Sequence, residues 1–204
     1  MALSLNKGCH ALTADQIKEA LEFFRGKHAD RNKACFMLGV CTGFRISELL
    51  SLKVYDVFDG KEIPEYVTVH KKNMKGGKAD KTGSRTTIIN DDTKPYLLKI
   101  IGERDVKEPL FVSQKKGKGG ALRPMSRTHM WTVYRQVYKD MGLRGFGWGT
   151  HTTRKSFAVF CYHQLDKDIR KLQGAMGHAD VSTTAKYVPD DRDQLIAVLK
   201  KPRF

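Results

Sequence analysis

Apolar residues recur at helical spacing over most of the chain, beginning near its N-terminus. Ile17, Leu21 and Phe24 follow one another every three or four positions, a spacing that puts them on one helix face. Thr13 precedes this run and Gln16 lies three positions later, which is typical of a capping box. We therefore expect the first helix to begin directly after Thr13.

The next segment, 31–41, is apolar over most of its length, which predicts a buried helix. Gly43 follows it as a natural left-handed cap. A third helix is expected from about Ser47, carrying Glu48, Leu49 and Leu52.

The period then changes, because 66–70 and 85–90 are rich in Val, Ile and Thr and predict strands. The Lys/Gly-rich stretch between them predicts an exposed hairpin tip, and a second Lys/Gly run at 114–124 predicts a loop. Further helical patterns occupy 95–101, the stretch after a Ser126 cap, 151–164, 166–175, 180–187 and 191–201. With no internal repeat or dividing linker, the pattern predicts one compact α+β domain that is mostly helical.

Charge adds a partner to this picture. Lys and Arg number 37 against 22 Asp and Glu, a formal net charge of +15. Such an excess favours a nucleic acid, whose neutralised phosphates release counterions. A basic protein that is merely soluble, ribosomal or bound at a membrane surface remains the alternative.

The cysteines Cys9, Cys35, Cys41 and Cys161 lack metal-ligand spacing, and the last three lie in apolar runs. A reducing, intracellular setting fits this pattern. The N-terminal residues do not resemble a secretory signal, and no segment reaches the roughly 20 apolar residues of a membrane span.

Four short clusters carry residues suited to chemistry. Arg45 follows the buried helix, with Glu48 three positions on, and a surface ion pair is the alternative interpretation. His151 and Arg154 share a helix face and together suit an anion, although a solvated polar face would look the same. His178 follows a turn at Gly177, where it could be a cap or a packed ring. Tyr187, in a helical pattern, is by itself more typical of packing than of a nucleophile.

Together these clusters resemble the tyrosine recombinase (phage integrase) family in order and spacing. TGFRISELLSL resembles its first arginine box, HTTRKSFA its second, and MGHADVSTTAKYV its closing motif. KTGSRTTIIN resembles its hairpin, with Arg85 one position closer to Lys81 than usual. Met176, Lys155 and Thr153 replace the Leu, His and Leu that are common there.

The resemblance implies a catalytic domain with a small three-stranded antiparallel sheet. It implies that Tyr187 attacks DNA to form a 3′-phosphotyrosyl bond while Arg45 and Arg154 clamp the phosphate. His178 would hydrogen-bond the same phosphate, His151 would assist the phenol as acid and base, and Lys81 would protonate the leaving oxygen. Glu48 would have a supporting role. Neither a cofactor nor a metal is expected.

The implied partner is double-stranded DNA, bound by a homotetramer with possible accessory DNA-bending proteins, in the cytoplasm of a prokaryotic cell and not at a membrane. The residues expected to contact DNA are Lys72, Lys75, Lys78, Lys115, Lys116, Lys118, Arg123, Arg127 and Arg135. Thr128 is a further candidate for base readout.

The expected organisation is an N-terminal arm (1–12), the catalytic domain (13–188) and a tail helix (189–204). The tail helix either docks on a neighbouring protomer or packs on its own domain. Family members usually carry an N-terminal core-binding domain, so the chain is either an excised fragment or a catalytic-domain-only member.

The implied function is site-specific recombination, by integration, excision or inversion. Two alternatives remain open. The first is DNA relaxation by a type IB topoisomerase, and the second is a DNA-binding module without catalysis.

Overall fold

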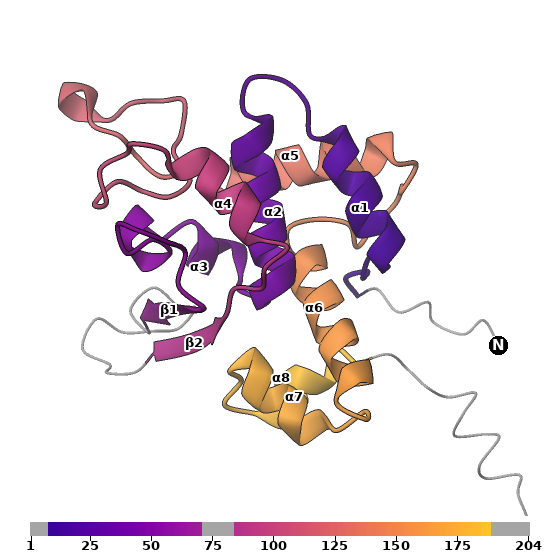
Figure 1. The fold of residues 1–204 in the computed structure, drawn as a ribbon. Helices are drawn as coiled ribbons and strands as arrows, with labels where there is room; N and C mark the ends of the chain where they lie inside the picture. Colours follow the sequence, from indigo (N-terminus) through magenta and orange to yellow (C-terminus); the bar gives the residue numbers. More distant parts are fainter. Residues whose placement is uncertain (1–7, 71–83, 189–204) are drawn as a thin grey trace, which may run out of the picture. The chain divides into compact units, whose positions relative to one another are not determined.

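The computed structural model describes residues 8–70 and 84–188, apart from the side chain of Lys118. The chain divides into two compact units, Met1–Phe157 and Ala158–Phe204, which are described separately below. Figure 1 shows the course of the chain through both units.

The first helix begins where the sequence predicts. Helix α1 spans Ala14–Phe23 and follows Thr13 as its cap. The Thr13 hydroxyl accepts the Gln16 backbone N–H at 3.2 Å, and the Gln16 side chain accepts the Thr13 N–H at 3.0 Å. The predicted capping box is therefore confirmed, with two helix-end donors satisfied.

Helix α2 spans Ala29–Thr42 and is mostly buried, as its apolar sequence predicts. It ends at Gly43, whose φ of 61° confirms the left-handed cap. Helix α3, Ile46–Leu49, begins one residue earlier than expected and ends before Leu52. The Ser51 hydroxyl donates to the Glu48 carbonyl at 2.7 Å, and the chain turns there into the short 3-10 helix η1, Val54–Asp56.

The sheet is smaller than expected. Strands β1 (Tyr66–His70) and β2 (Ser84–Ile88) pair antiparallel, with Tyr66 opposite Ile88. The predicted third strand is wrong for the described part of the chain, where the sheet has two strands. Elsewhere in the described residues, 8–70 and 84–188, extended segments meet at two single bridges, Lys53 with Pro109 and Val112 with Pro124. Proline has no N–H to continue a ladder, which accounts for the isolated bridges.

The core of the first unit gathers around α2. Helix α4 (Lys94–Ile101) and helix α3 pack against α2, while α5 (Arg127–Asp140) packs against α1 and α3 (Figure 1). The predicted Ser126 cap of α5 is confirmed by its bond to the His129 N–H. Inside, the rings of Phe24, Phe36 and Tyr134 lie 5.4–6.0 Å apart in tilted and edge-on pairs. The loop after α4 contains one turn of 3-10 helix, η3 (Lys118–Gly120).

Helix α6, His151–Gln164, runs from the first unit into the second. In the second unit, α7 (Ile169–Met176) and α8 (Val181–Ala185) pack against each other. Helix α7 begins three residues later than predicted because Asp166 and Lys167 adopt positive φ angles that a helix excludes. Helix α8 ends at Ala185, so Tyr187 lies on the turn after it.

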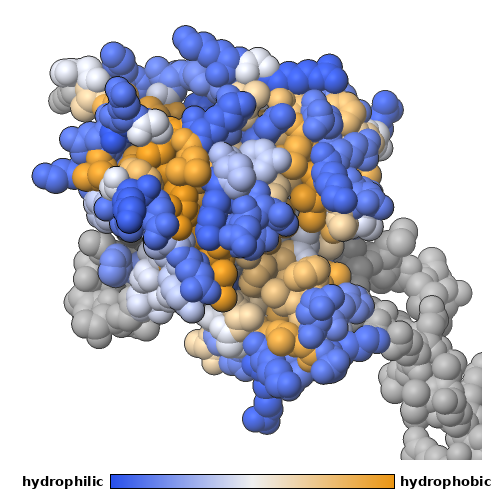
Figure 2. Space-filling model, in the orientation of Figure 1, coloured by the Kyte–Doolittle hydropathy of each residue, from blue (hydrophilic) through white to orange (hydrophobic). Residues whose placement is uncertain are grey.

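The expected hairpin tip and tail helix lie outside the described residues. Within the described ranges, none of the helices combines the length and apolar character that crossing a membrane requires. Hydrophilic side chains cover much of the face shown in Figure 2, where blue marks hydrophilic residues.

Candidate active site

Arg45 is held by a buried carboxylate at the start of α3. Glu48 has 0% of its surface exposed, and its Oε2 accepts the Arg45 backbone N–H at 2.7 Å. Glu48 Oε1 accepts Arg45 Nη1 at 2.9 Å, and the Arg45 side chain keeps 20% of its surface exposed. The ion pair that the sequence indicated exists, but its carboxylate is buried. A buried carboxylate needs such partners, and here they fix the guanidinium at the protein surface.

Arg85 approaches the same carboxylate from strand β2. The Arg85 side chain is buried, its Nη2 donates to the Thr42 carbonyl at 2.7 Å, and its Nη1 lies 4.0 Å from Glu48 Oε2. Its guanidinium also lies 4.8 Å from the centre of the Phe44 ring. The sequence motif contains Arg85, but we assigned it no role from the sequence. The alternation of a strand could have indicated its burial. Arg85 lies two residues before Thr87 and four before Ile89, so these three side chains share the inward face of the strand.

Arg154 is fully buried in α6 and donates from Nη1 to the Gly43 carbonyl. A Cβ atom on Gly43 would overlap the Phe157 ring. The backbone φ of Gly43, 61°, also disfavours any residue with a side chain. Glycine is therefore required at position 43 for two reasons. Its absence of a side chain lets the loop before α3 lie directly against α6.

These contacts gather three arginines around one short loop. Arg85 holds the carbonyl of Thr42, Arg154 holds the carbonyl of Gly43, and Arg45 is the cap residue of α3. The Glu48 carboxylate pairs with Arg45 and lies 4.0 Å from Arg85. Long-range contacts thus gather three guanidinium groups at one loop, and guanidinium groups suit a bound anion such as a phosphate.

His151 is the exposed first residue of α6, one helical turn before Arg154. Two neighbouring groups have shifted pKa values. Burial raises the pKa of the Cys9 thiol. The hydrogen bond to Thr152 and the charge of Lys155 lower this pKa, but by less than burial raises it. Burial also lowers the pKa of Lys155.

The second unit brings His178 and Tyr187 together. His178 follows Gly177, the left-handed cap of α7, and its Nδ1 lies 2.9 Å from the Thr184 hydroxyl oxygen. The ring centres of His178 and Tyr187 are 5.6 Å apart, with the His178 ring buried and Tyr187 partly exposed. Asp180 caps α8, and the backbone N–H of Ser182 lowers the pKa of this carboxyl. The unit thus presents a phenol beside an imidazole of fixed orientation.

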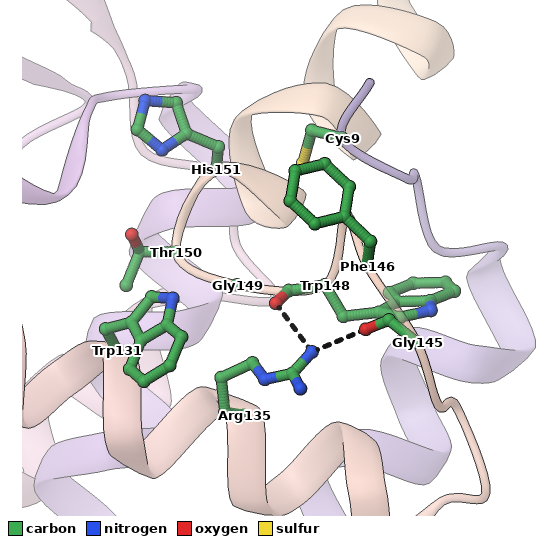
Figure 3. Close-up of a pocket in the computed structure, with 10 residues that line it drawn as sticks. Cys9, Trp131, Arg135, Gly145, Phe146, Trp148, Gly149, Thr150 and His151 are labelled. Atoms are coloured by element: carbon green, nitrogen blue, oxygen red, sulfur yellow. Dashed lines mark hydrogen bonds between the residues drawn. The ribbon is translucent and has the colours of Figure 1, made fainter. Parts of the chain in front are cut away.

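The residues expected to contact DNA fall into three groups. Lys115, Lys116, Arg123, Arg127 and Thr128 are exposed on and after the second basic loop. Arg135 instead turns towards the protein and donates to the carbonyls of Gly145 at 2.8 Å and Trp148 at 3.4 Å (Figure 3). Lys72, Lys75, Lys78 and Lys81 lie outside the described residues, as does the side chain of Lys118. Among the residues that the structure describes, no group of three or more His, Cys, Asp or Glu side chains could hold a metal ion.

Comparison with known proteins places this geometry in context. The model of the phage integrase family matches residues 10–193. The chain is 28% identical over 186 residues to the probable integrase/recombinase YoeC of Bacillus subtilis, covering 91% of this chain and 92% of that protein. It is 32% identical over 187 residues to the tyrosine recombinase XerD of Oceanobacillus iheyensis, covering 86% of this chain and 56% of that protein.

Solved structures share the fold. The crystal structure of XerA recombinase aligns over 97% of this chain and 67% of its own, with a TM-score of 0.69 and 23% identity. The pre-cleavage complex of XerH site-specific recombinase with its difH substrate aligns over 97% of this chain and 56% of its own, with a TM-score of 0.67 and 24% identity. The chain thus spans nearly all of YoeC but about half the length of these XerD and XerH proteins.

Proposed function

Since the chain belongs to the tyrosine recombinase (phage integrase) family, we propose that it is a site-specific recombinase that cuts and rejoins double-stranded DNA. The observation that carries this proposal is the loop at residues 42–45, around which Arg45, Arg85 and Arg154 gather. Two of these are the arginines that the family resemblance assigns to the phosphate. The reaction serves integration, excision or inversion.

In the proposed reaction, the phenol oxygen of Tyr187 attacks the scissile phosphorus. A bond forms between that oxygen and phosphorus, the bond to the 5′ oxygen breaks, and a 3′-phosphotyrosyl ester remains. The phenol proton passes to a base, for which we propose His151, because a free phenol has a pKa of about 10 and needs help. Lys81 gives a proton to the leaving 5′ oxygen. Attack by a 5′ hydroxyl reverses the steps, so the ester conserves the bond energy and no cofactor is needed.

Arg45 and Arg154 bind the non-bridging oxygens of the phosphate in this proposal, and His178 adds a hydrogen bond. Guanidinium groups stay charged at any relevant pH, and their planar fork fits two oxygens at once. Preorganised donors of this kind stabilise the charge that develops in the transition state. The buried arginine contacts of the first unit and the His178–Tyr187 pair of the second support these roles.

Glu48 and Arg85 act as positioning residues in the same proposal. Glu48 binds both the backbone and the guanidinium of Arg45, and Arg85 Nη1 lies 4.0 Å from Oε2, the oxygen that accepts the Arg45 backbone N–H. Arg85 also comes from β2, which begins three positions after Lys81 in the sequence. It therefore connects the strand that leads from Lys81 to the loop that carries Arg45.

The exposed basic residues after α4 would bind DNA phosphates without reading sequence. We further propose that the protein works as a tetramer on DNA in the cytoplasm of a prokaryotic cell, with accessory DNA-bending proteins at some sites. The tail segment 189–204 has an apolar pattern suited to docking on a neighbouring protomer.

The first experiment tests the nucleophile. DNA that becomes covalently attached to the wild-type protein is isolated and sequenced, and the site is rebuilt as a nicked suicide substrate. Wild type should form an adduct that survives denaturant, while Tyr187→Phe should form none. Tyr162→Phe is the matched control, because Tyr162 is another partly exposed tyrosine of the second unit, and it should react like wild type.

An adduct formed by Tyr187→Phe would overturn the nucleophile assignment. Strand exchange between two site-bearing duplexes separates a recombinase from a topoisomerase, which would only relax supercoiled DNA. Tight binding of the site without any adduct from wild type would favour a module without catalysis.

A further inference from the structure

A glycine-rich turn before α6 presents one phenylalanine to solvent. Phe146 has 77% of its surface exposed and lies between Gly145 and Gly147, whose φ angles of 92° and 93° disfavour other residues. A Cβ atom on Gly147 would lie 2.6 Å from the His10 ring, so the turn fits closely against the N-terminal segment. The His10 N–H donates to the Gly147 carbonyl at 3.1 Å.

Further contacts hold this turn in place. The His10 ring stacks on the Trp148 ring, with their centres 4.8 Å apart. The centre of the Tyr138 ring lies 5.7 Å from that of Trp148. Arg135 binds the carbonyls of Gly145 and Trp148 from helix α5. A phenyl ring on so constrained a turn loses little conformational freedom when it binds a ligand.

Phe146 borders a surface hollow of about 420 Å³, within the roughly 300–1,000 Å³ typical of small-ligand sites. The labelled rings of Phe146, Trp131 and His151 all border this hollow in Figure 3, and Arg135 reaches it from α5. Trp131 has 49% of its surface exposed. Gly149 makes room for the indole, since a Cβ there would lie 3.1 Å from Trp131 Nε1.

The chemistry of the hollow indicates its occupant. Its described lining residues include two exposed aromatic rings, a guanidinium and an imidazole, but no carboxylate. Exposed rings stack on nucleobases of any sequence, and the basic groups complement the phosphate next to a base. His151 lines this hollow and, in the proposed function, is the base that takes the phenol proton during attack on the phosphate.

We propose that the hollow binds an unstacked nucleobase of the DNA strand beside the phosphate that Arg45 and Arg154 bind in the proposed function. This inference rests on the proposed function for the identity of that phosphate. Phe146 and Trp131 stack on the base, and Arg135 keeps the turn that carries Phe146 in position. Taking a base out of the duplex costs stacking energy, which these rings replace.

The test uses two mixed-sequence duplexes that differ by one unpaired thymidine, with binding measured by fluorescence anisotropy of an end label. Wild type should bind the bulged duplex more tightly than the intact one. Phe146→Ala should reduce this preference by roughly fivefold or more, the range of one base–aromatic stack, while Phe146→Tyr retains it. Phe160→Ala removes another exposed phenyl, with 66% of its surface accessible, that does not line the hollow, and it should leave the preference unchanged.

A second readout uses the indole itself. The chain has two tryptophans, so Trp148→Phe leaves Trp131 as the one fluorophore of this type. The bulged duplex should quench its emission more than the intact duplex does. Circular dichroism and the melting temperature establish that each variant is folded.

The inference is overturned if folded Phe146→Ala keeps the full preference for the bulged duplex, or if both duplexes quench Trp131 equally. A loss of self-association by Phe146→Ala with no change in DNA preference would overturn it in favour of an interface between copies. Its failure is separable from that of the proposed function. Adduct formation by wild type tests the function alone, whereas the bulge preference is measured without cleavage.

Discussion

Two regions of the molecule are held in different ways: the loop at residues 42–45 of the first unit, around which Arg45, Arg85 and Arg154 gather, and the His178–Tyr187 pair of the second unit. The bonds of Arg154 to Gly43 and of Arg85 to Thr42 join residues 111 and 43 positions apart. The bond between His178 and Thr184 spans six positions. The first region therefore depends on the tertiary fold, and the second on its local sequence.

The two regions also differ in the core beneath them. The main apolar core of the described chain runs from Leu12 to Tyr138 and lies entirely in the first unit. Among the residues of the second unit that the structure describes, 158–188, the buried apolar residues are Ala158, Leu172 and Met176. Elements with few buried apolar contacts open at low free-energy cost. The difference indicates that the proposed phosphate-binding groups are built in advance, whereas the proposed nucleophile, Tyr187, lies in a unit whose described residues bury few apolar side chains.

Arg154→Lys should have the largest effect, because a lysine cannot reproduce the planar fork of a fully buried guanidinium. Adduct formation should slow by about 10²–10³-fold, the cost of losing one preorganised donor, while DNA binding persists. Single-turnover kinetics on the suicide substrate measure the rate. Arg25→Lys, at an exposed position two residues after the end of α1, is the control and should leave the rate unchanged. An unimpaired Arg154→Lys would show that the buried region does not bind the phosphate.

Gly43→Ala should have the second-largest effect. It places a side chain on a left-handed backbone, and the added Cβ clashes with the Phe157 ring. We expect a loss of about 1–2 kcal/mol from the backbone and of about 1–3 kcal/mol from overpacking, measured by denaturant unfolding. Gly119→Ala is matched closely, with φ 65° and ψ 18° against 61° and 17° at Gly43, and its Cβ would meet open space. Equal losses in both variants would mean that the close approach to α6 is unimportant.

Arg85→Lys should reduce the cleavage rate by about tenfold, because a displaced Arg45 no longer meets the phosphate in the productive geometry. The DNA dissociation constant should change little. A double-mutant cycle with Glu48→Gln provides the diagnostic readout. If Arg85 acts through the Glu48 carboxylate, the free-energy effects of the two substitutions are not additive. Strictly additive effects would contradict a positioning role.

Thr184→Val should have the smallest effect and tests the local region. It removes the hydroxyl beside His178 Nδ1 while keeping the shape of the side chain. The cost is that of one hydrogen bond, about 1 kcal/mol, which corresponds to about a fivefold slower rate of adduct formation. Thr183→Val is the neighbouring control, because Thr183 is partly exposed. A loss as large as that of Arg154→Lys would show that the two regions are equally preorganised.

Much of the architecture follows from local sequence patterns. The capping box at Thr13, the Gly43 cap and the Ser126 cap depend on a few neighbouring residues and are confirmed. The family is also confirmed, because its motifs combine residue type with spacing. Both strands of the sheet were predicted, but the third strand that the family resemblance implied is wrong for the described residues, where prolines limit the other extended segments to single bridges.

The site was less accessible to sequence reasoning. Helical spacing places His151 and Arg154 on one face, but it cannot show that Arg154 reaches the Gly43 carbonyl. Arg85 acquires its contacts only when β2 lies beside the loop after α2. The roles of all these residues in catalysis stay predictions that the kinetic experiments test.

The N-terminal segment has a consequence for how the protein is prepared. The Leu12 N–H donates to the Ser156 hydroxyl at 2.8 Å, and His10 binds the glycine-rich turn. Trimming the polypeptide to the start of α1 would therefore remove supports of the segment that carries His151, although no helix is shortened. An affinity tag is therefore better attached before residue 8 through a spacer than joined directly to α1, so that the contacts of His10 and Leu12 are kept.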